Sequence, residues 1–180
     1  MRHGQTEWNV LNRVSGWSDI MLDAVGVKQA VDAGKKLLDL NIEIAFASPL
    51  VRAQQTCQIA MSTWPYDRRV PITTDYRILE GYFGNAEGKI VTPESYVSRD
   101  FWGKRELASY DDMESLEEMD ARVKSFFDEI RTKHKGKNVL VVCHGGIMRM
   151  MAAYFLGKPE SGKYHDLGTF KNCEILSFDN

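Results

Sequence analysis

The sequence predicts an α/β fold, a three-layer α/β/α sandwich in which helices cover both faces of a mostly parallel central sheet. Helix-like and strand-like apolar patterns alternate along the chain, beginning with a helix and ending with a strand. Residues 139–143 form a continuous apolar run, which is typical of a parallel strand buried on both faces. In such sheets the functional site lies beyond the carboxyl ends of the strands.

The first part of the chain carries two helices and a strand. An apolar stripe predicts a helix over residues 24–40, with Asp23 at the position of an N-cap. Residues 42–47 are mostly apolar and short enough for a strand. The Ser-Pro pair at the start of residues 48–61 predicts a second helix, with Ser48 as its N-cap.

The middle of the chain is less regular. Residues 70–79 are a plausible strand region, whereas residues 81–114 contain glycine, proline and many aromatic residues and lack a period. Ser115 and Glu118 have the spacing of a capping box, which predicts the start of another helix.

The last part repeats the strand-to-helix order. After the strand at 139–143, two glycines and a methionine-rich stretch predict a helix over residues 145–156, which ends at Gly157. Residues 173–178 could form a last edge strand. The length of 180 residues suggests a single domain.

The composition excludes several classes of protein. Hydrophobic residues make up 43% of the chain and charged residues 27%, as in ordinary globular proteins. The net charge of −2 provides no general field for nucleic acid, and no apolar run is long enough for a membrane span. Three cysteines without a CxxC pair indicate reduced thiols, so we expect a cytoplasmic protein. The sequence has no metal-ligand spacing, and we expect neither a metal nor a cofactor.

Five short segments follow one another along the chain. In order they are Arg2-His3-Gly4-Gln5-Thr6-Glu7-Trp8-Asn9, Ser15-Gly16-Trp17-Ser18-Asp19, Ser48-Pro49-Leu50-Val51-Arg52-Ala53-Gln54-Gln55-Thr56, Leu79-Glu80 with Phe83-Gly84 and Glu87-Gly88, and His144-Gly145-Gly146. Their order and spacing resemble the histidine phosphatase superfamily, whose members are similar to phosphoglycerate mutase. The resemblance spans nearly the whole chain. It implies a phosphoglycerate mutase-like fold and one histidine phosphatase domain over residues 1–180, with a short cap insertion at about 88–114.

The resemblance also implies catalytic roles. His3 would attack phosphorus as a neutral imidazole and form a phosphohistidine. Glu80 would protonate the leaving oxygen and then activate water. His144 would donate a hydrogen bond to the transferred group. Glu87, although close to Glu80 in the sequence, is interpreted as a structural hydrogen-bonding residue.

Further residues would bind the phosphate or the rest of the substrate. Arginine can offer paired donors to phosphate oxygens, and asparagine can add a neutral donor. The residues in this group are Arg2, Asn9, Ser15, Gly16, Arg52 and Gly145. The expected partner is therefore a small phosphorylated substrate, bound by a monomer or a homodimer, with no nucleic acid or membrane involved.

Three alternatives to a histidine-dependent phosphatase remain open. Cys143 and Arg149 form a C-x5-R pattern between a strand and a helix, which cysteine-dependent phosphatases use. Within the histidine family, the choice lies between a phosphatase and a mutase. Arg13 before the Ser15–Gly16 turn resembles the mutases, but no cation follows Glu80, and the stretch between Glu87 and the capping box is short. These features favour a phosphatase that hydrolyses a small organic phosphomonoester. A non-catalytic phosphate-binding role is the remaining alternative.

The start of the numbered chain is unusual for this resemblance. The family has a full strand before its first motif, whereas only Met1 precedes Arg2 here. A nucleophile so close to a terminus would fray unless it is held. We therefore expect either a strand upstream of this numbering, or a weakened site and low stability.

Overall fold

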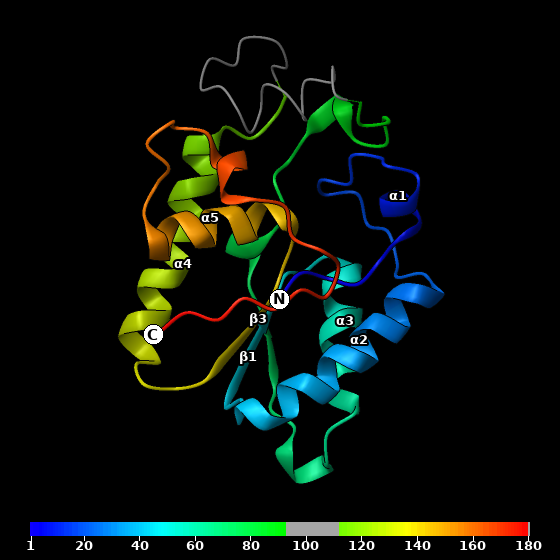
Figure 1. The fold of residues 1–180 in the computed structure, drawn as a ribbon, viewed down its shortest axis with the longest axis vertical. Helices are drawn as coiled ribbons and strands as arrows, with labels where there is room; N and C mark the ends of the chain where they lie inside the picture. The colour runs from blue at the N-terminus through cyan, green and yellow to red at the C-terminus, as the bar shows by residue number, and fades with distance from the viewer. Residues whose placement is uncertain (93–111, 180) are drawn as a thin grey trace.

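A computed structural model describes residues 1–92 and 112–179 (Figure 1). Its central sheet contains three parallel strands in the order β2-β1-β3, namely Ile72–Thr74, Ile44–Ala47 and Val139–Val142. The main helices are α1 (Glu7–Val10), α2 (Ala24–Leu37), α3 (Val51–Ser62), α4 (Leu116–Lys133) and α5 (Gly145–Leu156). The predicted α/β class with a mostly parallel sheet is confirmed.

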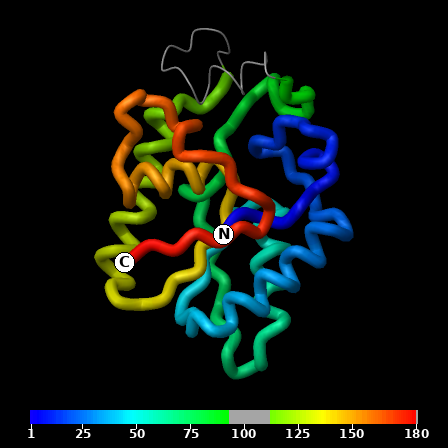
Figure 2. Tube along the Cα trace, in the orientation of Figure 1, coloured from blue at the N-terminus to red at the C-terminus, as the bar shows by residue number. Residues whose placement is uncertain are grey.

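Side chains that alternate along each strand pack into two separate hydrophobic cores. In β1, Ala45 and Ala47 pack in the cluster formed with α2 and α3, whereas Phe46 packs in the cluster formed with α4 and α5. In β3, Leu140 and Val142 face the α2 and α3 side. The helices therefore cover both faces of the sheet, as the tube in Figure 2 also shows.

Most helix boundaries agree with the sequence patterns. Asp23 caps α2 by accepting a hydrogen bond from Gly26 N. The capping box is present at the start of α4, where Ser115 and Glu118 bond reciprocally. Gly157 ends α5 with φ +94°, a conformation that favours glycine.

Three sequence-based predictions are wrong in detail. Ser48 is not the N-cap of α3, which begins at Val51 after Leu50. Its buried hydroxyl lies ahead of the helix, where it is bonded to His144 Nε2 at 2.7 Å and accepts from Leu50 N at 3.5 Å. Only Ile72–Thr74 of residues 70–79 is a strand, since a 3₁₀ turn begins at Tyr76. Residues 173–178 form no strand, and the segment begins in a turn where Cys173 has a positive φ of 57°.

The expected cap at 88–114 lies mostly outside the described residues. In the part that is described, Val14 and Val91 donate backbone bonds that tie residues 88–91 to the segment around Arg13.

Hydrogen bonds to two other segments hold the first residues. Met1 donates its ammonium to Val141 O at 2.7 Å, and its own carbonyl accepts from Cys143 N at 3.0 Å. Arg2 N donates to Glu174 O at 3.1 Å, so the C-terminal segment lies on the other side. Burial lowers the pKa of the Met1 amine.

Two glycines let the segment after His3 lie directly on α2. A Cβ atom at Gly26 would lie 2.1 Å from Gln5 O, and one at Gly4 would lie 2.6 Å from Gly26 O. Only glycine allows this approach, because the atoms in the way belong to the backbone.

Gly26→Ala should therefore lower the free energy of unfolding by about 2–3 kcal/mol, as overpacking does elsewhere. Val25→Ala, in the same turn and 51% exposed, is the matched control and should change it by less than about 0.5 kcal/mol. Urea unfolding followed by circular dichroism measures both. Equal stability of the two variants would contradict the tight contact.

Candidate active site

The predicted site residues gather at the carboxyl end of the sheet, around a cavity of about 500 Å³. Eight of the nine residues line it: Arg2, His3, Asn9, Ser15, Gly16, Arg52, Glu80 and Gly145. The ninth, His144, lies directly behind, with its ring centroid 5.2 Å from that of His3.

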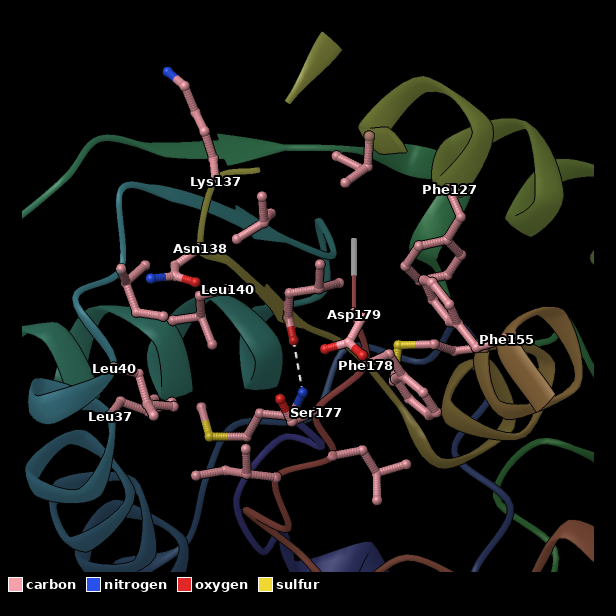
Figure 3. A pocket seen from close by; sticks show the side chains of 18 of the residues that line it. Leu37, Leu40, Phe127, Lys137, Asn138, Leu140, Phe155, Ser177, Phe178 and Asp179 are labelled. Carbon is pink, nitrogen blue, oxygen red and sulfur yellow. Dashed lines mark hydrogen bonds between the residues drawn. The ribbon is translucent and has the colours of Figure 1, made fainter. Parts of the chain in front are cut away.

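A second cavity lies elsewhere and has a different character (Figure 3). Its volume is about 360 Å³, and it opens between Leu37 and Leu140 on one side and Phe127 and Phe155 on the other. None of the predicted site residues lines this cavity. We therefore take the first cavity as the candidate active site.

His3 is held as a neutral imidazole with one nitrogen committed. Its Nδ1 lies 2.7 Å from Gly4 O. Because a carbonyl only accepts, Nδ1 must carry the proton, and Nε2 keeps its lone pair. Burial, followed by the charges of Arg52 and Arg2, holds the pKa of His3 well below 6.5. An unprotonated Nε2 is the form that can act as a nucleophile.

His144 is also buried and neutral. Burial is the main cause that holds its pKa well below 6.5, and Arg52 and His3 lower it further. Its Nε2 lies 2.7 Å from Ser48 Oγ, while its Nδ1 is buried without a partner among the described residues. If the Ser48 hydroxyl donates to Nε2, Nδ1 carries the proton and can donate it to a bound group.

Two arginines add further donors. Arg52 is fully buried and donates to Ser18 O and Gly16 O, and burial lowers its pKa to about 10. Arg2 donates to Phe170 O at 2.6 Å. In each guanidinium, Nε is buried and has no partner among the described residues. A buried donor without an acceptor is costly, and a bound anion would satisfy both.

Glu80 is anchored by backbone amides. Its Oε1 accepts from Gly81 N at 3.0 Å, and its Oε2 accepts from Gly146 N at 3.1 Å, in the first turn of α5. The carboxyl group thus lies between the loop after η3 (Tyr76–Ile78) and the helix that follows His144. It is the only carboxylate among the described residues that line the cavity.

The other predicted binding residues line the cavity in different ways. Asn9 Oδ1 accepts from Thr6 N and from Asn172, so its amide nitrogen is the group left to donate to a ligand. Gly16 has φ +49°, and a Cβ there would lie 2.0 Å from Glu87 Oε1. Ser15 precedes it and lines the same wall.

Glu87 has the structural role that the sequence predicts. Its two oxygens accept from the backbone amides of Trp17, Ser18 and Phe83 and from the Ser18 hydroxyl. The residue therefore joins the Ser15–Gly16 turn to the loop after Glu80.

The geometry disfavours the cysteine alternative. The Cys143 side chain is fully buried and does not line the cavity. Burial raises the pKa of its thiol to about 11, so the thiolate is scarce at neutral pH.

Sequence reasoning missed several residues of the site. The sequence pattern identifies Ser48 only as a helix cap, although this serine belongs to the Ser48-Pro49-Leu50 motif. Thr56 accepts from Gly4 N and donates to Arg52 O, which ties the first motif to α3. Phe170 also lines the cavity, and no motif in the sequence could have identified it.

Other functional features are absent from the described part of the chain. Within residues 1–92 and 112–179, no three His, Cys, Asp or Glu side chains are arranged to hold a metal ion. No described helix has both the length and the apolar character needed to cross a membrane.

The comparisons with known proteins identify the class. A family model of the histidine phosphatase superfamily (branch 1) matches residues 1–179, and the chain belongs to this family. The phosphoglycerate mutase of Schizosaccharomyces pombe is 33% identical over 162 residues, which cover 83% of this chain and 74% of that protein. The 2,3-bisphosphoglycerate-dependent phosphoglycerate mutase of Cytophaga hutchinsonii is 34% identical and covers 94% and 82%.

Solved structures agree on the fold. YhfR of Bacillus stearothermophilus superposes with a TM-score of 0.83 and 27% identity, over 96% of this chain and 85% of that one. A mycobacterial glucosyl-3-phosphoglycerate phosphatase reaches a TM-score of 0.80 at 24% identity, with 96% and 87% covered. The neighbours of this chain thus include phosphatases, and its sequence relatives include mutases.

The two neutral histidines should make stability depend on pH. In the unfolded chain they take up protons near pH 6.5, whereas the folded protein excludes these protons. The contribution of the histidines to the free energy of unfolding should therefore be fully present above pH 6.5 and be lost below it, by up to about 1.4 kcal/mol per pH unit for each histidine. The buried Met1 amine, whose pKa is also lowered, adds a loss that begins as the pH falls through about 8. Urea unfolding between about pH 8 and pH 5 measures this slope.

His144→Gln should remove about half of the histidine part of that slope, since one of two such groups is removed. Ser62→Ala is the control, because it removes an exposed hydroxyl that does not titrate, and its slope should equal that of the parent. A parent protein whose stability is unchanged below pH 6.5 would contradict the neutral, buried histidines.

Ser48→Ala should leave His144 Nε2 buried without a partner and cost about 1–3 kcal/mol of stability. Ring nitrogen chemical shifts of His144 should show the Nδ1–H tautomer in the parent and a change in the variant. Ser62→Ala removes an exposed hydroxyl at the end of α3 and serves as control. An Nε2–H tautomer in the parent would show that His144 donates to Ser48 instead.

Proposed function

We propose that the chain is a phosphatase that hydrolyses a small organic phosphomonoester through a phosphohistidine at His3. One observation carries this proposal. His3 lines the cavity as a neutral ring with Nε2 unprotonated, beside Arg2 and Arg52, whose buried Nε donors have no acceptor among the described residues. His144 Nδ1 is likewise buried without a partner in that part of the chain, and it is a third donor if Ser48 donates to Nε2. A nucleophile among unpaired donors suits an electrophile that carries negative charge, and a phosphoryl group is one.

In the first step, His3 Nε2 attacks phosphorus. The N–P bond forms while the P–O bond to the leaving group breaks, and Glu80 gives its proton to the leaving oxygen. Arg2, Arg52 and His144 stabilise the charge on the phosphoryl oxygens. Gly4 O, which accepts from His3 Nδ1, stabilises the positive charge that the ring gains.

In the second step, the Glu80 carboxylate takes a proton from water, whose oxygen attacks phosphorus. The N–P bond breaks, inorganic phosphate leaves, and His3 returns to its neutral form. The backbone amides of Gly81 and Gly146 keep the Glu80 carboxyl in place during both steps.

Two features support hydrolysis over transfer to a second substrate. The residues that follow Glu80 in the sequence are Gly81, Tyr82 and Phe83, none of which is a cation, although Arg13 and Arg149 do line the cavity. Apolar groups of Val14, Phe83 and Phe170 line the cavity beside the arginines. Such a wall suits the carbon skeleton of a leaving group, and the volume suits a small molecule.

Phosphoglycerate mutase activity is the second candidate. The observation that favours it is the identity of 33–34% to two phosphoglycerate mutases. A mutase would use the same phosphohistidine but return the phosphoryl group to an alcohol of a sugar acid in place of water. The monomeric or homodimeric state and the cytoplasmic location stay predictions.

Rapid quenching with a labelled aryl phosphate tests the intermediate. We expect a labelled protein adduct that is stable in base and lost in acid, because phosphohistidine has a labile N–P bond. The adduct should be absent from His3→Ala and present at parental level in Cys143→Ser. An acid-stable adduct that disappears in Cys143→Ser would move the nucleophile to the cysteine and overturn the proposal.

The fate of the phosphoryl group separates the two activities. In isotopically labelled water, a phosphatase puts the label into inorganic phosphate at each turnover. We expect this release to exceed, by about tenfold or more, any isomerisation of added phosphoglycerate in the presence of a bisphosphate primer. Isomerisation faster than release would assign the chain to the mutases.

A further inference from the structure

Arg122 of α4 binds the loop that carries Glu80 and uses every N–H of its guanidinium. Nη1 donates to Arg77 O and Leu79 O, both at 2.7 Å, and Nη2 donates to Glu80 O at 3.0 Å. The remaining N–H groups, on Nε and Nη2, bind the two oxygens of Glu114. Five donors thus meet five acceptors, which is the full capacity of an arginine.

Glu114 contacts the part of the same loop that follows Glu80. Its Oε2 accepts from Tyr82 N at 3.3 Å, and its own amide donates to Tyr82 O at 3.0 Å. The Arg122–Glu114 pair therefore contacts the main chain on both sides of Glu80. The two side chains are only 17% and 12% exposed, so water competes little for these bonds.

The backbone of Glu80 has one further anchor. Trp17 Nε1 donates to Glu80 O at 2.7 Å, from the turn that follows Gly16. The Glu80 carbonyl thus accepts from both Arg122 and Trp17. Neither Arg122 nor Glu114 is among the residues that line the cavity, so neither contacts a group bound there. The charge of Arg122 also helps to lower the pKa of His144, and a variant that keeps this charge isolates the effect on the loop.

We propose that Arg122 and Glu114 are positioning residues that hold the Glu80 carboxyl where it can protonate the leaving oxygen. The inference rests on the proposed function, in which Glu80 is the proton donor. Proton transfer needs a donor within hydrogen-bond reach of the acceptor, so a small displacement of the loop lowers the rate.

The conservative variant is Arg122→Lys. Lysine keeps the charge near Glu114, but its three donors sit on one atom and cannot bridge Arg77 O, Leu79 O and Glu80 O together with both Glu114 oxygens. Glu114→Gln is the second variant, because it weakens the same unit from the other side and keeps the shape of the side chain.

Leaving groups of different basicity distinguish positioning from general stability. A nitrophenyl phosphate has a leaving oxygen that needs little protonation, whereas an alkyl phosphate depends on the acid. The rate of phosphohistidine formation is measured with both substrates by rapid quenching. Arg122→Lys and Glu114→Gln should slow the alkyl substrate by about tenfold and the nitrophenyl substrate by no more than about twofold.

Arg77→Gln is the matched control. Its side chain also joins this loop to α4, through Asp75 and Glu129, but it does not contact the Glu80 backbone. Arg77→Gln should leave the ratio of the alkyl rate to the nitrophenyl rate at the parental value. Loss of that ratio in Arg77→Gln would show that any weakening of the loop–helix contact is sufficient, and it would overturn the specific role of Arg122.

Glu80→Gln distinguishes the role of Glu80 as the acid from the positioning role of Arg122. It should slow the alkyl substrate selectively, by about a hundredfold, and the double variant with Arg122→Lys should lose little more. If Glu80→Gln is selective but Arg122→Lys slows both substrates equally, the positioning role is wrong and the acid role stands. If Glu80→Gln is not selective, the acid role and the inference built on it are both wrong.

Discussion

The backbone pairing between the first residues and Cys143 is the interaction on which the site depends. Cys143 N donates to Met1 O, and His3 N donates to Cys143 O at 2.9 Å. The two segments run parallel, so the residues that follow the pairing emerge on the same side. His3 and His144 are thereby brought together although 140 residues separate them. No side-chain contact in the cavity could achieve this by itself.

Burial then gives these side chains their chemical state. Two histidines beside two arginines would repel one another if they were protonated, and desolvation adds to the cost of a charge. The rings therefore stay neutral while the guanidinium groups, with much higher pKa values, keep their charge. The same arrangement that disfavours a proton on the rings favours an anion between them.

The sequence predicts those helices, strands and site residues that depend on local patterns and short motifs. The helices after Asp23 and Ser115, the strand at Val139–Val142 and the grouping of the motif residues were all predicted from it. Ser48 also belongs to a motif, but the local sequence pattern indicates only a helix cap at this serine. Its contact with His144 is long-range, and only the structure reveals it. Arg122 and Glu114 belong to no motif. Apart from each other, the partners that link them to the Glu80 loop are backbone atoms, which any sequence would offer.

The residues that anchor Glu80 are different from those that form the nearby wall of the cavity, so the two groups can change independently. Glu80 is held from outside the cavity by Arg122, Glu114 and Trp17, and the wall near it includes loop side chains such as Val14 and Phe170. Replacing the wall leaves those anchors untouched. Substrate preference can therefore diverge among descendants of such a chain, or under laboratory selection, while the reactive groups keep their positions.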